Sequence, residues 1–180
     1  MRKVRKAVIT AAGRGTRQYP ASSAVQKEMF PLVDRDGLTK PVIQIVVEEA
    51  IDSGIEEICI ITQPGEERLY RDYFRRLDDV MIKAFKGKDW AIRESEKLQA
   101  FGERLSFVEQ PSPEGFGHAV YQARRFVGDE PFVLLLTGVA LLSLARLGPP
   151  RRAASARIEP DEAGSVEDGR PAAPRLERAA

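Results

Sequence analysis

Short apolar runs alternate with amphipathic stretches along most of this chain. Four runs rich in aliphatic and β-branched residues predict buried strands, at 6–12, 55–65, 103–110 and 130–136. Between them, apolar positions at helical spacing predict helices at 40–54, 66–85, 88–102 and 118–128. The second of these strands closes in a Pro64–Gly65 turn, and the helices at 66–85 and 88–102 are expected to form a hairpin.

Strands that alternate with helices predict an α/β fold, Rossmann-like, with a mostly parallel sheet flanked by helices. The strand at 130–136 is apolar throughout, so we expect it to lie in the centre of the sheet. In such sheets ligands bind over the carboxyl ends of the strands, and the loops that follow the strands are expected to converge there.

Charge and composition exclude several classes of function. The net charge is +1, which gives no indication of a nucleic-acid or membrane surface. Cys59 lies inside an apolar run and is expected to be a buried, reduced thiol. The basic N-terminus leads into an apolar stretch too short for a signal peptide, so we expect a cytoplasmic protein.

The loop after the first strand, "AAGRGTR", combines glycines with cations. Gly13 and Gly15 let the backbone present its N–H groups to an oxyanion or a base edge. Arg14 and Arg17 suit phosphate oxygens, and Lys27 is a compact charge on a long stem. The loop is neither a Walker loop nor a dinucleotide fingerprint, because the required Lys-Ser/Thr pair and third glycine are missing. Taken alone, it could equally be a glycine turn with surface arginines.

Four segments in order carry a resemblance to a known family. They are "AAGRGTRQYP", "QKEMFPLVD", "KPVIQIVVEEAIDSGIEEICIIT" and "EQPSPEGFGHAV". Together they resemble the sugar-phosphate nucleotidylyltransferases, and among these the bacterial UTP–glucose-1-phosphate uridylyltransferases. The resemblance covers residues 6–136 and implies a fold of the nucleotide-diphospho-sugar transferase type.

The resemblance implies the transfer of a uridylyl group from UTP to glucose 1-phosphate, with Mg²⁺ bridging phosphates. It implies catalytic roles for Arg17 and Lys27, and the nucleotide would contact Ala11, Ala12, Gly13, Gly15, Thr16, Gln110 and Gly117. Glu28 would orient Lys27, and His118 would pack near the base without taking part in the chemistry. Asp34 and Asp36 are expected to form a turn bent by Gly37.

The chain also departs from the family pattern. Ser22 and Ser23 stand where the family has Thr-Lys, Gln26 stands where it has proline, and "RDGLT" is an apparent insertion before Lys40. The aspartate that holds Mg²⁺ after the fourth strand is missing, because Thr137-Gly138-Val139 follow Leu136. No metal ligand is therefore assigned.

Composition changes after the fourth strand. We expect residues 1–136 to form the N-terminal part of a nucleotide-binding domain, truncated before its sugar-binding half. Residues 137–180 lack lysine and aromatic residues, so we expect them to be disordered, and hypothesise an out-of-frame tail. A truncated chain of this kind would be weakly active or inactive.

Two alternatives stay open at this point. The chain could be a non-catalytic nucleotide-binding module, or a thymidylyl-, cytidylyl- or guanylyltransferase of the same family. A homo-oligomer is compatible with the resemblance, and neither nucleic acid nor membrane is expected as a partner.

Overall fold

A four-stranded parallel sheet forms the centre of the protein. The computed structural model describes residues 3–137, and the predictions for 138–180 lie outside these residues. The strands are β1 (Lys6–Thr10), β4 (Glu57–Thr62), β5 (Leu105–Glu109) and β6 (Phe132–Leu136), in the order β5-β4-β1-β6. All three pairings are parallel, which confirms the predicted fold class.

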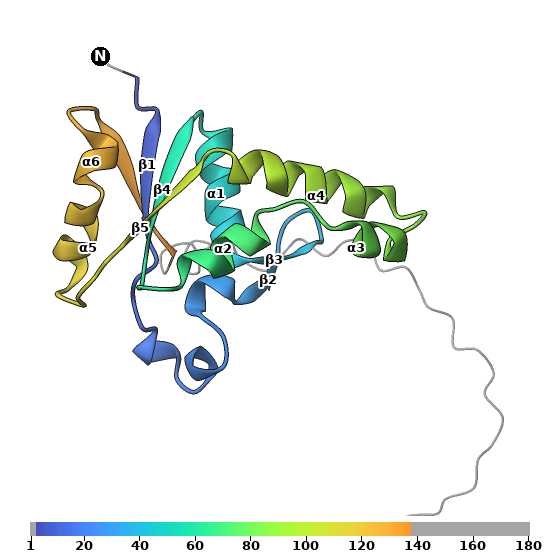
Figure 1. Ribbon diagram of the computed structural model, residues 1–180, viewed down its shortest axis with the longest axis horizontal. Helices are drawn as coiled ribbons and strands as arrows, with labels where there is room; N and C mark the ends of the chain where they lie inside the picture. The colour runs from blue at the N-terminus through green and yellow to red at the C-terminus, as the bar shows by residue number, and fades with distance from the viewer. Residues whose placement is uncertain (1–2, 138–180) are drawn as a thin grey trace, which may run out of the picture. The chain divides into compact units, whose positions relative to one another are not determined.

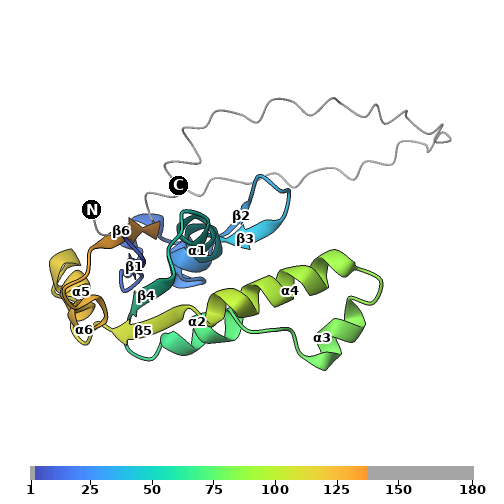
Figure 2. The same ribbon diagram turned by 90° about the horizontal axis from the view of Figure 1, so that it is seen from above.

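Helices cover both faces of this sheet (Figures 1 and 2). The helices α5 (Phe116–Gln122) and α6 (Arg124–Val127) lie on one face. The other face carries α1 (Val42–Asp52), with α2 (Glu67–Tyr73) and α4 (Asp89–Gly102) beside it. Side chains alternate along the strands, so that Val8 and Cys59 pack toward α5 while Ile9 and Ile60 pack toward α1. Each face therefore has its own apolar core, and Cys59 is buried as predicted.

The position predicted for the last strand is wrong. Among the described residues, β6 pairs with β1 alone and stands at the end of the strand order. Phe132, Val133 and Leu136 keep between 37% and 39% of their surface exposed. An apolar run indicates that both faces of a strand can be covered, but it does not determine the place of the strand in the sheet.

The helix predicted at 66–85 is two helices, α2 and α3 (Asp79–Ala84). The break has a local cause, because the Asp78 side chain accepts a hydrogen bond from the Met81 N–H and starts a new helix. The ends of α2 and α4 approach closely, and a Cβ at Gly102 would lie 2.3 Å from the Phe74 carbonyl oxygen. Only a glycine fits at this contact.

A β-hairpin precedes α1 and was not predicted. The strands β2 (Pro31–Val33) and β3 (Thr39–Pro41) pair antiparallel around the expected turn. Gly37 has a positive φ of 82°, which supplies the predicted bend, and Asp34 and Asp36 lie in the turn. Each strand has only three residues, so no alternation of apolar and polar positions could be recognised in the sequence.

Candidate nucleotide site

The glycine loop leaves the carboxyl end of β1 and folds back on itself. Its first residue is fixed to the sheet, since the Ala11 N–H donates to the Ile61 carbonyl oxygen at 2.8 Å. Three short 3-10 helices follow, η1 (Thr16–Gln18), η2 (Ala21–Ser23) and η3 (Lys27–Met29). A Cβ at Gly13 would lie 3.3 Å from Lys27 Cε, so this glycine lets the lysine side chain cross close to the backbone.

A cavity of about 590 Å³ opens where this loop meets the carboxyl ends of β1, β5 and β6. It lies where a parallel α/β sheet is expected to bind its ligand. Its lining includes two arginines, a lysine and two glutamines. The lining residues are Thr10, Ala12, Gly13, Arg14, Arg17, Gln18, Lys27, Gln110, Pro113, Gly115, Phe116, Ala119, Leu136 and Thr137.

Lys27 reaches the cavity from a largely buried position. Its ammonium contacts the carboxylate of Glu28, of which 1% is exposed, and donates to the Thr137 hydroxyl at 3.3 Å. Burial lowers the pKa of Lys27 to about 8, and the nearby Glu66 carboxylate opposes that shift. Glu28 therefore holds Lys27 in place, as the sequence predicted. A lysine that has already lost part of its hydration is suited to bind an anion.

Gln110 has its side chain oriented by the turn that follows β5. Its Nε2 donates to the Gly115 carbonyl oxygen at 3.1 Å and lies 3.2 Å from His118 Nδ1. Because Gly115 presents an acceptor, the amide nitrogen must point toward it, and Oε1 is left as the acceptor of this side chain. His118 lies in the first turn of α5 beside Gln110, where it packs rather than reaching the cavity.

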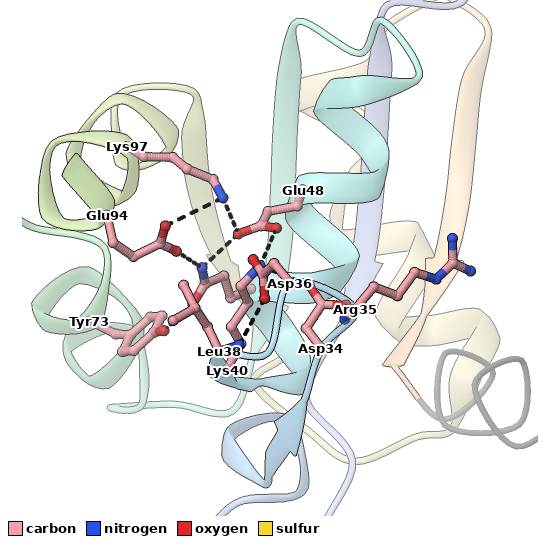
Figure 3. Close-up of polar contacts among 10 residues, drawn as sticks. Asp34, Arg35, Asp36, Leu38, Lys40, Glu48, Tyr73, Glu94 and Lys97 are labelled. Carbon is pink, nitrogen blue, oxygen red and sulfur yellow. Dashed lines mark hydrogen bonds and ion pairs between the residues drawn. The ribbon is translucent and has the colours of Figure 1, made fainter. Parts of the chain in front are cut away.

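A buried polar cluster fixes the hairpin that follows Lys27 (Figure 3). Lys40 on β3 is 3% exposed, and its ammonium lies 2.8 Å from Asp34, 2.6 Å from Asp36 and 2.9 Å from Glu48 of α1. Lys97 of α4 pairs with the same glutamate at 2.8 Å. Lys40 thus joins the hairpin to α1 through Glu48, and Lys97 joins α4 to the same glutamate.

These charges outweigh the cost of burying Lys40. Burial opposes the charged form, but the hydrogen bonds that the Lys40 ammonium donates to Asp34, Asp36 and Glu48 raise its pKa above the ordinary value. The pKa of Asp34 and that of Asp36 are both lowered, chiefly by their bonds to Lys40, although burial of Asp34 acts in the opposite direction. The two aspartates are therefore committed to this ion-pair cluster.

A protein-family model matches most of the chain. Residues 6–146 match the family described as nucleotidyl transferase. The chain belongs to this family.

The curated relatives of this nucleotidyl transferase are named consistently. The chain is 43% identical over 138 residues to the UTP–glucose-1-phosphate uridylyltransferase of Bacillus subtilis. This alignment covers 76% of this chain and 44% of the relative. It is 44% identical over 137 residues to UTP–glucose-1-phosphate uridylyltransferase 2 of Staphylococcus saprophyticus, with 76% and 45% covered. The chain thus spans less than half the length of these relatives.

Solved structures agree with these relatives. A UDP-glucose pyrophosphorylase complexed with UDP-glucose matches with a TM-score of 0.56 and 33% identity. The UTP-bound enzyme of Acinetobacter baumannii matches with a TM-score of 0.57 and 35% identity. Each alignment covers 75% of this chain and 46% of the solved one.

The nucleotidyl transferase fold brings together part of the residue set that the sequence predicted. Five of these residues line the cavity, namely Ala12, Gly13, Arg17, Lys27 and Gln110. Ala11, Gly15, Thr16 and Gly117 are neighbours of lining residues and are not themselves part of the lining in the described structure.

Sequence reasoning missed several lining residues, of which Phe116 and Thr137 are the most informative. Phe116 was included only in a loop, yet it begins α5 and is 51% exposed, a position that suits contact with a flat ring. Thr137 was assigned to the tail, yet it is buried against Lys27 and Glu28. An exposed aromatic residue after a strand could have been recognised, whereas the contact with Thr137 depends on β1 pairing with β6.

Within residues 3–137, no group of three or more acidic, histidine or cysteine side chains that could hold a metal ion is found. The cavity lining contains no carboxylate, and Thr137 presents a hydroxyl beside the Glu28–Lys27 pair.

The helices described within residues 3–137 include none with the length and apolar character needed to span a membrane.

Proposed function

We propose that this chain supplies the UTP-binding half of a UTP–glucose-1-phosphate uridylyltransferase. In that reaction a phosphate oxygen of glucose 1-phosphate attacks the α-phosphorus of UTP. The bond to the β-phosphate breaks, so that UDP-glucose forms and pyrophosphate leaves. The carrying observation is the cavity at the carboxyl ends of β1, β5 and β6, which Arg17, Lys27 and Gln110 all line. The names of the relatives and of the UTP-bound structure support the same substrate.

The loop residues would act on the triphosphate. The attacking phosphate is already ionised, so the reaction needs alignment and neutralisation of charge more than a strong base. Arg17 has the planar fork that binds two phosphate oxygens, and Lys27 supplies a fixed charge at the α-phosphate. The backbone at Ala11, Ala12 and Gly13 would contact the base, and that of Gly15 and Thr16 would follow the phosphates.

Gln110 would recognise the uracil. Its Oε1 acceptor matches the N3–H that uracil presents, whereas cytosine presents an acceptor at N3. Gly117 would approach the nucleoside through its backbone. The orientation of Gln110 therefore favours uridylyl or thymidylyl transfer over cytidylyl transfer.

Magnesium would bind to the phosphates of UTP, where it would neutralise negative charge. The lining of the cavity offers it no carboxylate within the described residues, so none of the roles above depends on a protein-bound metal. This feature also favours a second function, that of a nucleotide-binding module which does not transfer the nucleotide. A cytoplasmic location and self-association remain predictions from the sequence.

Isothermal titration calorimetry with UTP tests this proposal. We expect the chain to bind UTP, and Arg17→Gln and Lys27→Met each to weaken binding by about tenfold or more, since each removes a charge-assisted contact worth roughly 1.5–3 kcal/mol. Lys83→Met, an exposed lysine of α3, removes the same charge elsewhere and should bind normally. Arg17 is itself exposed, so its variant should fold even if loss of Lys27 disturbs Glu28.

The outcomes separate the alternatives. Binding unaffected by both substitutions would contradict the proposal. Equal affinity for UTP and CTP would contradict the role of Gln110. Tight binding of UTP without Mg²⁺, together with no transfer by a chain fused to the missing half of a relative, would favour the binding module.

A further inference from the structure

Tyr70 of α2 connects the apolar core to the segment that carries Lys27. The side chain is fully buried, and its ring packs near Phe107 of β5 with centroids 6.3 Å apart. Its hydroxyl donates a hydrogen bond of 2.9 Å to Oε1 of Gln26. A buried tyrosine hydroxyl requires a partner, and here the partner immediately precedes Lys27 in sequence.

Gln26 is well placed to transmit this restraint. The preceding residues 23–25 are exposed, so Gln26 is where the segment turns inward after η2. Its carbonyl oxygen accepts from the Met29 N–H at 2.9 Å, which closes η3. The residue is thereby held through both its backbone and its side chain, and its Cα is joined to that of Lys27 by a single peptide unit.

The helix that carries Tyr70 is itself anchored at the other end. Tyr73, on the next turn of α2, donates its hydroxyl to Oε1 of Gln44. Gln44 is 1% exposed and donates to Glu48 at 2.6 Å, inside the cluster around Lys40 that Figure 3 shows. At the C-terminal end of α2, the Phe74 carbonyl lies against Gly102 of α4. Because α2 is fixed at these points, a bond from Tyr70 can hold the segment at Gln26, where the chain turns inward after the exposed residues 23–25.

We propose that Tyr70 is a positioning residue for Lys27, acting through its hydrogen bond to Gln26. Without this bond the segment that follows η2 would sample more conformations, and the Lys27 ammonium would spend less time in the cavity. The proposal rests on the proposed function for its link to UTP, but the geometry of the bond does not depend on the ligand.

The backbone at Gln26 offers an independent restraint with which to test this role. Its φ is −59°, close to the value that a proline ring imposes. Its N–H donates no backbone hydrogen bond within the described residues, so a proline here would break none of these bonds. Proline can therefore replace the restraint from the tyrosine hydroxyl with one from the chain itself.

The experiment compares Tyr70→Phe, Gln26→Pro and the double variant. We expect Tyr70→Phe to weaken UTP binding about three- to tenfold, the effect of losing one hydrogen bond. We expect the double variant to recover affinity to within about twofold of the unmodified chain, because proline fixes the loop without the hydroxyl. Gln26→Pro alone should bind UTP well but unfold at lower temperature, since it leaves the Tyr70 hydroxyl buried and unpaired.

A purely structural role would give a different pattern. Tyr70→Phe would then lower the midpoint of thermal unfolding without changing the affinity of the folded protein, and proline would not rescue it. Either unchanged affinity in Tyr70→Phe or failure of the double variant to recover would overturn the proposal.

A second readout needs no nucleotide and separates this proposal from the proposed function. Nuclear magnetic resonance of chain labelled with carbon-13 at lysine Cε follows the titration of Lys27, assigned by loss of its signal in Lys27→Arg. The groups that act on this ammonium are Glu28 in contact, Glu66 nearby and the Thr137 hydroxyl. Tyr70→Phe should move the pKa upward from about 8, because a looser loop hydrates the lysine. An unchanged titration would overturn the proposal even if the chain does not bind UTP.

Discussion

At the scale of single residues, the site depends on Lys27, a lysine whose burial disfavours its charged form. Lys27 lies between the Glu28 carboxylate, the Thr137 hydroxyl and an open cavity. Glu66 contributes negative charge nearby, and its buried Oε2 has no hydrogen-bond partner in the described structure. Burial lowers the pKa of Lys27 to about 8, within the range where solution pH controls its charge.

The affinity for UTP should consequently depend on pH. Below pH 8 the lysine is charged and binds phosphate, whereas above pH 8 it increasingly loses its proton. The affinity should therefore fall as pH rises, approaching about tenfold per pH unit well above the pKa. Calorimetric titrations between about pH 7 and pH 9.5 measure this slope.

Lys27→Arg serves as the control for that slope, because a guanidinium stays charged over the whole range. Its profile should fall much less steeply than that of the unmodified chain, whatever its absolute affinity. If the unmodified chain bound UTP equally well at both ends of the range, Lys27 would not be the titrating phosphate ligand.

At the scale of elements, the β2–β3 hairpin connects the site to the rest of the fold. A single residue, Phe30, separates the hairpin from η3. The Val42 N–H at the start of α1 donates to the Phe30 carbonyl oxygen at 3.1 Å. Lys40 holds the hairpin through three carboxylates. The same buried ammonium therefore restrains both the hairpin and the direction in which the chain leaves Lys27.

Substitution of Lys40 should destabilise the protein more than substitution of its neighbour Lys97. Lys40→Met leaves three carboxylates facing each other without their shared cation, which should cost about 3–5 kcal/mol of unfolding free energy. Lys97 is 37% exposed, so Lys97→Met should cost no more than about 1 kcal/mol. Urea denaturation of the two variants measures the difference, and equal stability would show that the hairpin is held by other contacts.

The elements also show how far the sequence alone could predict the structure. The strands of the parallel sheet and α1 followed from apolar runs bounded by charge, proline and glycine. The family resemblance implied Gly13, Arg17, Lys27 and Gln110, which line one cavity. The hairpin and the break before α3 were missed because each depends on a few local polar contacts, such as the Asp78 cap, that no apolar periodicity reveals. The place of β6 at the end of the strand order depends on its pairing with β1, which is distant in sequence.

At the scale of the whole molecule, half of the cavity lining comes from one segment of the described residues. Seven of the fourteen lining residues, from Thr10 to Lys27, belong to the loop after β1 and its flanks. The lining holds no carboxylate, and the relatives extend well beyond the segment that matches this chain.

We therefore expect the chain to bind UTP but to form UDP-glucose very slowly. The family pattern places an aspartate after the fourth strand, and this chain lacks it. Loss of a principal electrostatic stabiliser of this kind costs roughly 3–4 kcal/mol, or two to three orders of magnitude in rate. An assay with radiolabelled UTP and glucose 1-phosphate measures product directly. A chimera in which residues 1–136 continue into the downstream half of the Bacillus subtilis relative should recover turnover, and rapid turnover by the chain itself would refute this expectation.

The contact between Lys27 and Thr137 joins two residues that are 110 positions apart in sequence. Thr137 directly follows β6, which pairs in parallel with β1, the strand that leads into the glycine loop. During synthesis, a ribosome must therefore release almost the entire described region before the pocket acquires its last wall. Nascent chains that end ahead of β6 would leave the lysine without this neighbour, so the wall of the cavity is complete only once β6 has joined the sheet.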